Sequence, residues 1–179
     1  RDNIEALKIA LPDSGYVFGT NSTNTESFAE GYSIPGQFAR VYGTFLVTPA
    51  AIGDWTSSKV TIAVYSGNGK PERLIHSQVF KPKYTNYNTE SLSFDETDKP
   101  LNRDMETFVP FTSDVVVENE FYISYTIENA QGDTFAIYNL KSGKTARNTA
   151  WIKRQGVWEP ASNLVDFSTS LFIDPVIQY

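Results

Sequence analysis

The chain has no cysteine and only one histidine among its 179 residues. It can therefore form no disulfide and no thiolate nucleophile, and one histidine cannot supply the several His or Cys ligands of a usual zinc site. A Ser-His-Asp triad would have to use His76, and the sequence contains no G-x-S-x-G motif. His76 stands inside the run R-L-I-H-S-Q-V-F, which favours a strand histidine at a sheet edge or facing solvent. We therefore expect no enzymatic activity.

Positive charge is also scarce, with 15 Lys and Arg against 21 Asp and Glu and a net charge of −6. Such a chain repels the phosphate backbone, so nucleic acid is excluded as an expected partner. An anionic membrane surface is disfavoured for the same reason. No apolar run approaches the roughly 20 residues that a membrane-spanning helix needs, so we expect no membrane insertion.

What the sequence does contain is a series of short segments in which apolar and polar residues alternate. The clearest are V-T-I-A-V-Y at 60–65, E-F-Y-I-S-Y-T-I at 120–127 and S-T-S-L-F-I-D-P-V-I at 168–177. Alternation of this kind is typical of half-buried strands. The sequence predicts an all-β protein, an antiparallel β-sandwich of about ten to twelve strands with no long helix.

The remaining segments complete this prediction within one domain, residues 1–179. We expect turns at 66–71 and at Glu118 and Asn119, and a hairpin of 150–154 with 156–158. The polar stretch 81–105 is long enough to be a functional loop. Further strands are predicted at 28–32, 40–48, 73–80, 106–111, 115–117 and 134–140.

Four motifs resemble an accessory domain of secreted and surface proteins of Bacteroidetes. They are G-Y-V-F-G-T-N-S-T-N-T-E-S-F-A-E at 15–30, V-T-I-A-V-Y-S-G-N-G-K-P at 60–71, T-A-W-I-K-R-Q-G-V-W at 149–158 and S-L-F-I-D-P-V-I at 170–177. They occur in the same order as in that family and span the chain from residue 15 to its end.

The resemblance implies a jelly-roll-like sandwich similar to galactose-binding and carbohydrate-binding modules. It implies an extracellular or cell-surface location, and we expect the chain to be part of a larger secreted polypeptide. The expected function is that of a non-catalytic binding or accessory module, in adhesion or in targeting to a carbohydrate or protein. Its partner would be a glycan or a surface protein. The alternative is an accessory domain that supports the peptidase domain of the same polypeptide.

Aromatic residues flanked by polar ones are the candidate ligand-binding groups. Tyr84 and Tyr87 in K-P-K-Y-T-N-Y-N, together with Trp55, suit stacking against a sugar ring or contact with a protein. Trp151 lies in the alternating run A-W-I, which predicts that its side chain is in the core, although Trp151 and Trp158 could also bind.

A structural calcium ion is one hypothesis for a cofactor, because Ca²⁺ needs only oxygen ligands. In jelly-roll carbohydrate modules such an ion bridges an early loop and the closing strand. The corresponding positions here are Asn21, Asn24, Glu26 and Asp174. The alternative is that Asn21 and Asn24 only stabilise a turn through bonds to the backbone.

Overall fold

A computed structural model gives the fold of the chain. It describes residues 4–6, 15–19, 25–48, 50–52, 59–81, 106–128, 134–140, 148–165 and 170–179. The described elements are β1 (Ile4–Ala6), β2 (Gly15–Gly19), β3 (Ser27–Val47), β4 (Ala50–Ile52), β5 (Lys59–Gly67), β6 (Pro71–Phe80), β7 (Glu106–Glu128), β8 (Thr134–Leu140), β9 (Ala150–Arg154), β10 (Val157–Pro160), α1 (Ser162–Val165), β11 (Ser170–Leu171) and β12 (Ile173–Gln178).

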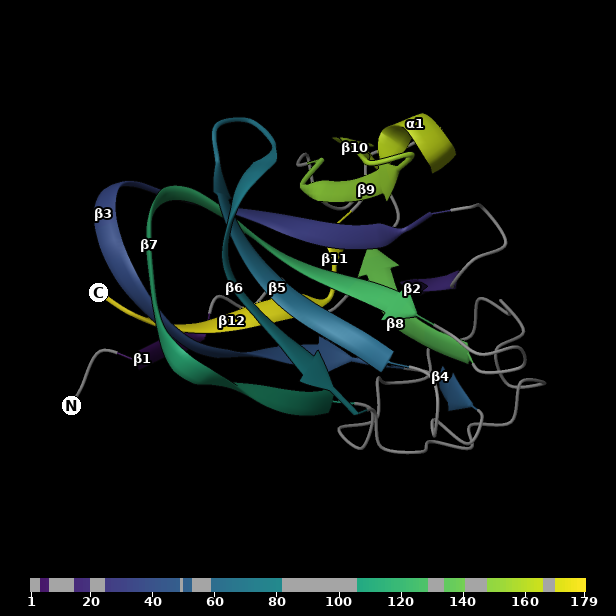
Figure 1. The fold of residues 1–179 in the computed structure, drawn as a ribbon, viewed down its shortest axis with the longest axis horizontal. Coiled ribbons are helices and arrows are strands. Elements are labelled where there is room, and N and C mark those ends of the chain that lie inside the picture. Colours follow the sequence, from purple (N-terminus) through teal and green to yellow (C-terminus); the bar gives the residue numbers. More distant parts are fainter. Residues whose placement is uncertain are drawn as a thin grey trace.

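The described strands pair antiparallel throughout, which confirms the prediction of an antiparallel all-β protein. The larger sheet has the order β1-β12-β3-β7-β5-β6, with the hairpin β9–β10 attached to β3. The smaller sheet has the order β11-β8-β2, with β4 also paired to β8. In Figure 1, β9, β10 and α1 gather at one end of the molecule, beside the first part of β3.

Two strands, β3 and β7, are much longer than the sequence pattern predicts. The separate strands expected at 28–32 and 40–48 are parts of β3, and those at 106–111, 115–117 and 121–127 are parts of β7. The turn expected at Glu118 and Asn119 is wrong. Asn119 has a φ of 54°, but β7 continues through it, and its side-chain Oδ1 accepts the N–H of Gly36 at 3.0 Å. Figure 1 shows both strands curving round together at this bend.

The core lies on one face of the central strands, and the alternating residues of β5 and β7 that point to it are Val60, Ile62, Val64, Phe121, Ile123 and Tyr125. Phe135 of β8, from the smaller sheet, contacts this face. Its ring centroid lies 5.7 Å from that of Tyr125 and 6.4 Å from that of Phe80, both edge-on. Side chains of both sheets therefore belong to one hydrophobic cluster.

The hairpin between β5 and β6 is confirmed where the sequence predicts it, at S-G-N-G-K-P. Gly69 has a φ of +74°, a conformation that glycine adopts without steric cost. Gly67 is required for a different reason, because a Cβ there would lie 1.8 Å from the carbonyl oxygen of Lys70. That oxygen belongs to the backbone, so it cannot move without opening the turn.

We therefore expect Gly67→Ala to destabilise the protein by about 1–3 kcal/mol, as forced backbone strain does. In a chain of this size the melting temperature should fall by several degrees, measured by circular dichroism. Asn68→Ala, a change at the exposed neighbouring position, is the control and should alter the melting temperature little. Equal melting temperatures for Gly67→Ala and the parent would contradict the steric argument.

A buried polar cluster joins the start of β3 to the closing strands. Glu30 is 1% exposed, and its Oε2 accepts the N–H of Leu171 at 2.7 Å. Tyr32 donates its hydroxyl hydrogen bond to the carbonyl of Ile173. Burial raises the pKa of Glu30, and the negative charge of buried Asp174 raises it further, to about 8. Hydrogen bonds with Thr149 and Leu171 lower this pKa, but their effect is smaller than that of burial. Glu30 is therefore largely protonated at neutral pH.

This pKa predicts how stability depends on pH. The folded value of about 8 lies above the ordinary value of 4.5, so the protonated carboxyl favours the folded state. The contribution is complete below about pH 4.5 and is lost as the pH rises to about 8. Glu30→Gln keeps a neutral group that can accept the same N–H. We expect it to melt at least about 2 °C above the parent at pH 8, with a flatter pH profile between pH 5 and 8.

The matched control is Glu118→Gln, since Glu118 is an exposed carboxylate of β7. Its melting profile should follow that of the parent at every pH. If the melting temperature of Glu30→Gln depended on pH as steeply as that of the parent, a group other than Glu30 would cause the pH dependence.

Candidate functional site

The face of the central strands that points away from the core carries small residues and aromatic rings. In β3, β5 and β7 it is formed by the residues that alternate with the core residues, namely Ser27, Ala29, Gly31, Thr61, Ala63, Tyr65, Tyr122, Ser124 and Thr126. We call this the outer face. Gly31 has no side chain because the ring of Tyr122 lies over it, with Cε1 3.0 Å from the place of a Cβ.

Four rings meet on the outer face and form what we call the aromatic cluster, Tyr65, Tyr122, Trp151 and Trp158. Tyr65 and Tyr122 are direct partners across β5 and β7. The ring of Trp151 stands perpendicular to that of Tyr122, with centroids 6.1 Å apart, and that of Trp158 is edge-on to Tyr65 at 5.8 Å. Tyr122 is buried, whereas the other three are partly exposed, so the cluster offers ring surface to solvent.

The two tryptophans reach the outer face because the β9–β10 hairpin is attached to β3. Trp151 is the register partner of Ala29, and Trp158 is that of Lys153. Gln155 and Gly156 connect the strands with φ values of 50° and 76°. Two successive residues at positive φ form the tight turn that suits the twist of a hairpin. The hairpin predicted at 150–158 is thereby confirmed.

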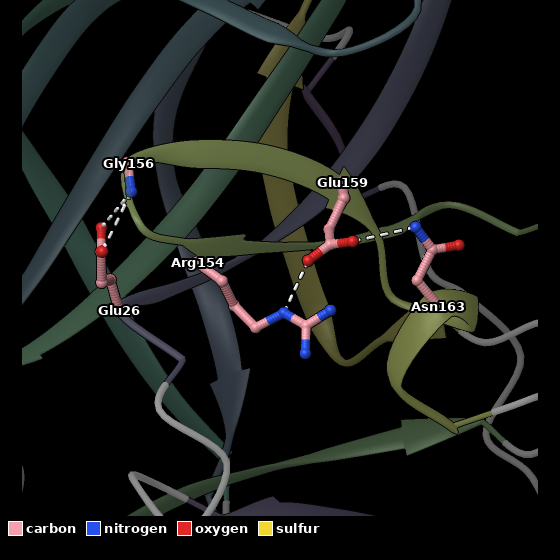
Figure 2. A network of polar contacts seen from close by, with 5 residues as sticks. All are labelled: Glu26, Arg154, Gly156, Glu159 and Asn163. Atoms are coloured by element: carbon pink, nitrogen blue, oxygen red, sulfur yellow. Dashed lines mark hydrogen bonds and ion pairs between the residues drawn. The ribbon is translucent and has the colours of Figure 1, made fainter.

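Polar contacts fix this hairpin at its turn, between its two strands and to α1, as Figure 2 shows. At the turn, the carboxylate of Glu26 accepts the N–H of Gly156 at 3.0 and 3.3 Å from its two oxygens. Between the two strands, Arg154 Nε donates to Glu159 Oε1 at 2.6 Å, and from α1 Asn163 Nδ2 donates to Glu159 Oε2 at 2.9 Å. These bonds lower the pKa of Glu159 and raise that of Arg154, so both stay charged.

Charged and hydrogen-bonding groups stand beside the rings. Lys153 Nζ lies 5.9 Å from the centre of the Trp158 ring. The hydroxyl of Tyr122 donates to Glu120 Oε2 at 3.2 Å, and the same oxygen accepts the N–H of Gly69 at 2.7 Å. Burial raises the pKa of Tyr122 well above its ordinary value, and the negative charge of Glu120 adds to this. Tyr122 therefore remains a neutral phenol at physiological pH.

Comparison with known proteins identifies no relative of the chain. No protein-family model, no curated protein and no solved structure matches the chain. The resemblance to the Bacteroidetes accessory domain therefore depends on the residues themselves.

The ligand-binding residues predicted from the sequence, Tyr84, Tyr87 and Trp55, lie outside the described residues. The prediction that Trp151 is in the core is wrong. Ala150 and Ile152 are the buried residues of A-W-I, and Trp151 points to the opposite face, where it is partly exposed. The alternation is real, but the small residue and the isoleucine face inward.

Of the four residues predicted to hold calcium, Asn21 and Asn24 lie outside the described residues, and calcium binding stays a prediction. Glu26 is exposed and bonds the hairpin turn, whereas Asp174 is buried in β12 opposite Phe45. Within the described part of the chain, no three His, Asp or Glu side chains gather as a metal site would require. In the same part, no helix is both long and apolar enough to cross a membrane.

His76 lies on β6, the edge strand of the larger sheet as described, where the sequence predicts a histidine at an edge. Its Nδ1 is 2.9 Å from Ser113 Oγ, and its Nε2 is 2.9 Å from Gln78 Oε1. The group on the far side of the imidazole is thus a neutral amide, where a triad has a carboxylate that stabilises the imidazolium.

Sequence reasoning missed Tyr65 and Tyr122, although the signal was present. In V-T-I-A-V-Y and F-Y-I-S-Y-T-I, the valines and isoleucines define the core face, which leaves both tyrosines on the other one. Their meeting depends on the register between β5 and β7, which alternation within one strand does not give.

We expect Glu26→Ala to loosen the hairpin that carries the tryptophans, because the Gly156 N–H then loses its acceptor. A hydrogen bond is worth about 1 kcal/mol, so amide hydrogen exchange at Gly156 should be roughly fivefold faster. Glu118→Ala removes an exposed carboxylate of β7 and should leave this exchange unchanged. If Glu26→Ala left the exchange rate at Gly156 unchanged, the turn would keep its conformation without the bond from Glu26.

Proposed function

We propose that the chain is a non-catalytic binding module of an extracellular or cell-surface bacterial protein, and that the aromatic cluster binds a glycan. In this proposal the fold is a jelly-roll-like β-sandwich of about ten to twelve strands, as in galactose-binding accessory domains of Bacteroidetes. The contact of Phe135 in the smaller sheet with Tyr125 in the larger one supports the two-layer arrangement.

The observation that carries the proposal is the set of partly exposed rings fixed on a rigid strand face. Sugar rings have apolar C–H faces that suit aromatic surfaces, and hydroxyl groups that need hydrogen-bond partners. The aromatic cluster supplies Trp151, Trp158 and Tyr65, with Lys153 and Glu120 close by. Since the rings are held edge-to-face by strand pairing and by the hairpin contacts, little conformational entropy would be lost on binding.

A second function is favoured by a different observation. Phe38 is 67% exposed and Val116 is 53% exposed. They lie on neighbouring positions of the β3–β7 bend, because Phe38 pairs with Glu118 and Val116 with Arg40. An exposed apolar pair inside a charged rim suits contact with another protein surface. This supports the alternative of an accessory domain that supports a peptidase domain of the same polypeptide.

The proposal is tested by glycan-array binding followed by calorimetry with the best-bound oligosaccharide. Trp158→Ala should weaken that binding by about tenfold or more, because an anchoring ring is lost. Trp158→Phe should restore part of the affinity, since it restores a ring. The control Phe38→Ala removes an equally aromatic but more exposed ring and should bind glycan like the parent.

Two results would overturn the glycan proposal, namely no binding to any glycan, or equal losses in Trp158→Ala and Phe38→Ala. If instead Phe38→Ala alone weakens capture of the peptidase domain, the alternative function is supported.

A further inference from the structure

A bulge in β7 creates a groove whose lining residues are all different from those of the aromatic cluster. Val41 of β3 pairs with Val115, and Gly43 pairs with Pro110. One residue of β3, Tyr42, therefore faces four residues of β7, 111–114. Such bulges interrupt the hydrogen-bond ladder and redirect side chains. Here they leave a groove of about 220 Å³, the bulge groove, lined by Val41, Tyr42, Phe111, Thr112, Ser113 and Asp114.

The wall of the bulge groove is held in place by the edge strand β6. Gln78 Nε2 donates to the carbonyl of Pro110 at 2.9 Å, and its Oε1 accepts the N–H of Thr112 at 3.0 Å. Gln78 thus bonds the backbone of the bulge as a neighbouring strand would. His76 adds its bond to Ser113 and a ring contact with Phe111, at 5.0 Å between centroids. The groove is therefore formed before any ligand arrives.

The opposite wall is fixed as well, since the hydroxyl of Tyr42 donates to Gln178 Oε1 of β12. Asp114 lies 3.8 Å from Arg40, but both side chains are substantially exposed, so this ion pair is weak. The carboxylate of Asp114 consequently remains available as a strong hydrogen-bond acceptor. Because Gln78 Oε1 can only accept, Nε2 of the neutral His76 ring carries the hydrogen and Nδ1 accepts from the Ser113 hydroxyl, whose oxygen can still accept from a ligand.

These features select a class of ligand. The volume lies below the roughly 300–1,000 Å³ of sites for drug-sized molecules, so the open groove itself can hold about one ring of a ligand. Hydroxyl groups and a carboxylate beside Phe111 and Tyr42 suit a molecule with an apolar face and several hydroxyls. The guanidinium of Arg40 lies 3.8 Å from Asp114 and offsets its charge, so the groove suits a neutral molecule. A carboxylate with two acceptor oxygens matches a pair of adjacent hydroxyls.

We propose that the bulge groove is a second binding site, which takes a single neutral sugar ring whose adjacent hydroxyls donate to Asp114. This inference deepens the proposed function and rests on it for the class of ligand. It assigns to the chain two sites of different kind. The aromatic cluster provides a surface for an extended glycan, and the bulge groove a recess for one ring.

The test is a titration of the ¹⁵N-labelled chain with glucose, galactose and mannose, followed by NMR. At least one hexose should cause saturable shifts of the amides of Thr112, Ser113 and Asp114. Asp114→Asn should weaken this binding at least about tenfold, because a charged acceptor is lost. Glu118→Gln makes the same change of charge four residues further along β7, outside the groove lining, and should alter the affinity less than about twofold.

The same titration separates this inference from the proposed function. Saturable shifts confined to the indole signals of Trp151 and Trp158 would overturn the second site and leave the glycan-binding function standing. Shifts in the bulge groove, with oligosaccharide binding insensitive to Trp158→Ala, would establish the second site and overturn the role of the aromatic cluster. No saturable shift with any hexose, or equal effects of Asp114→Asn and Glu118→Gln, would overturn this inference.

Discussion

The pairing of β3 with β7 is the constraint on which the rest of the described structure depends. The two strands pair from Ser27 opposite Thr126 to Val47 opposite Glu106, and the ladder is interrupted only at the bend and at the second register shift. Each strand also brings other strands into the sheet. β3 holds β9 and β12, and β7 holds β5. One pairing therefore determines which side chains face the core and which face outward, and it places the bulge of β7 beside β6.

Where the regular ladder stops, side-chain oxygens take over its role. A buried N–H without an acceptor is costly, so buried N–H groups need a partner, and two exposed turn N–H groups here also have one. In this protein carboxylate and amide groups accept backbone N–H groups at the hairpin turns, at the bulge and at the start of the closing strands. The pairs are Glu26 with Gly156, Glu120 with Gly69, Gln78 with Thr112 and Glu30 with Leu171.

The two faces of the larger sheet differ in which residues they carry. The inner face holds the aliphatic and aromatic cluster that stabilises the fold, together with Glu30, whose carboxyl is kept protonated by burial. The outer face holds buried small residues and the buried ring of Tyr122, and three partly exposed rings lie over it. Shortening Tyr65, Trp151 or Trp158 should therefore cost less stability than shortening a core ring, because part of its apolar area is already in contact with water.

The sequence by itself determined the class of fold and most strand positions, because alternation is local and is visible within each segment. The same alternation places Tyr65 and Tyr122 on the face opposite the core residues, although sequence reasoning did not single them out. The sequence could not show that residues 28–32 and 40–48 belong to one strand. A strand that bends and a strand that ends both interrupt the alternation of apolar and polar residues in the same way. The sequence misplaced Trp151, because alternation gives two faces and does not say which is buried. Only the tertiary structure brought the two tyrosines to the two tryptophans, and placed His76 and Gln78 against the bulge. Both meetings depend on strand register, which is decided by packing between segments far apart in the chain.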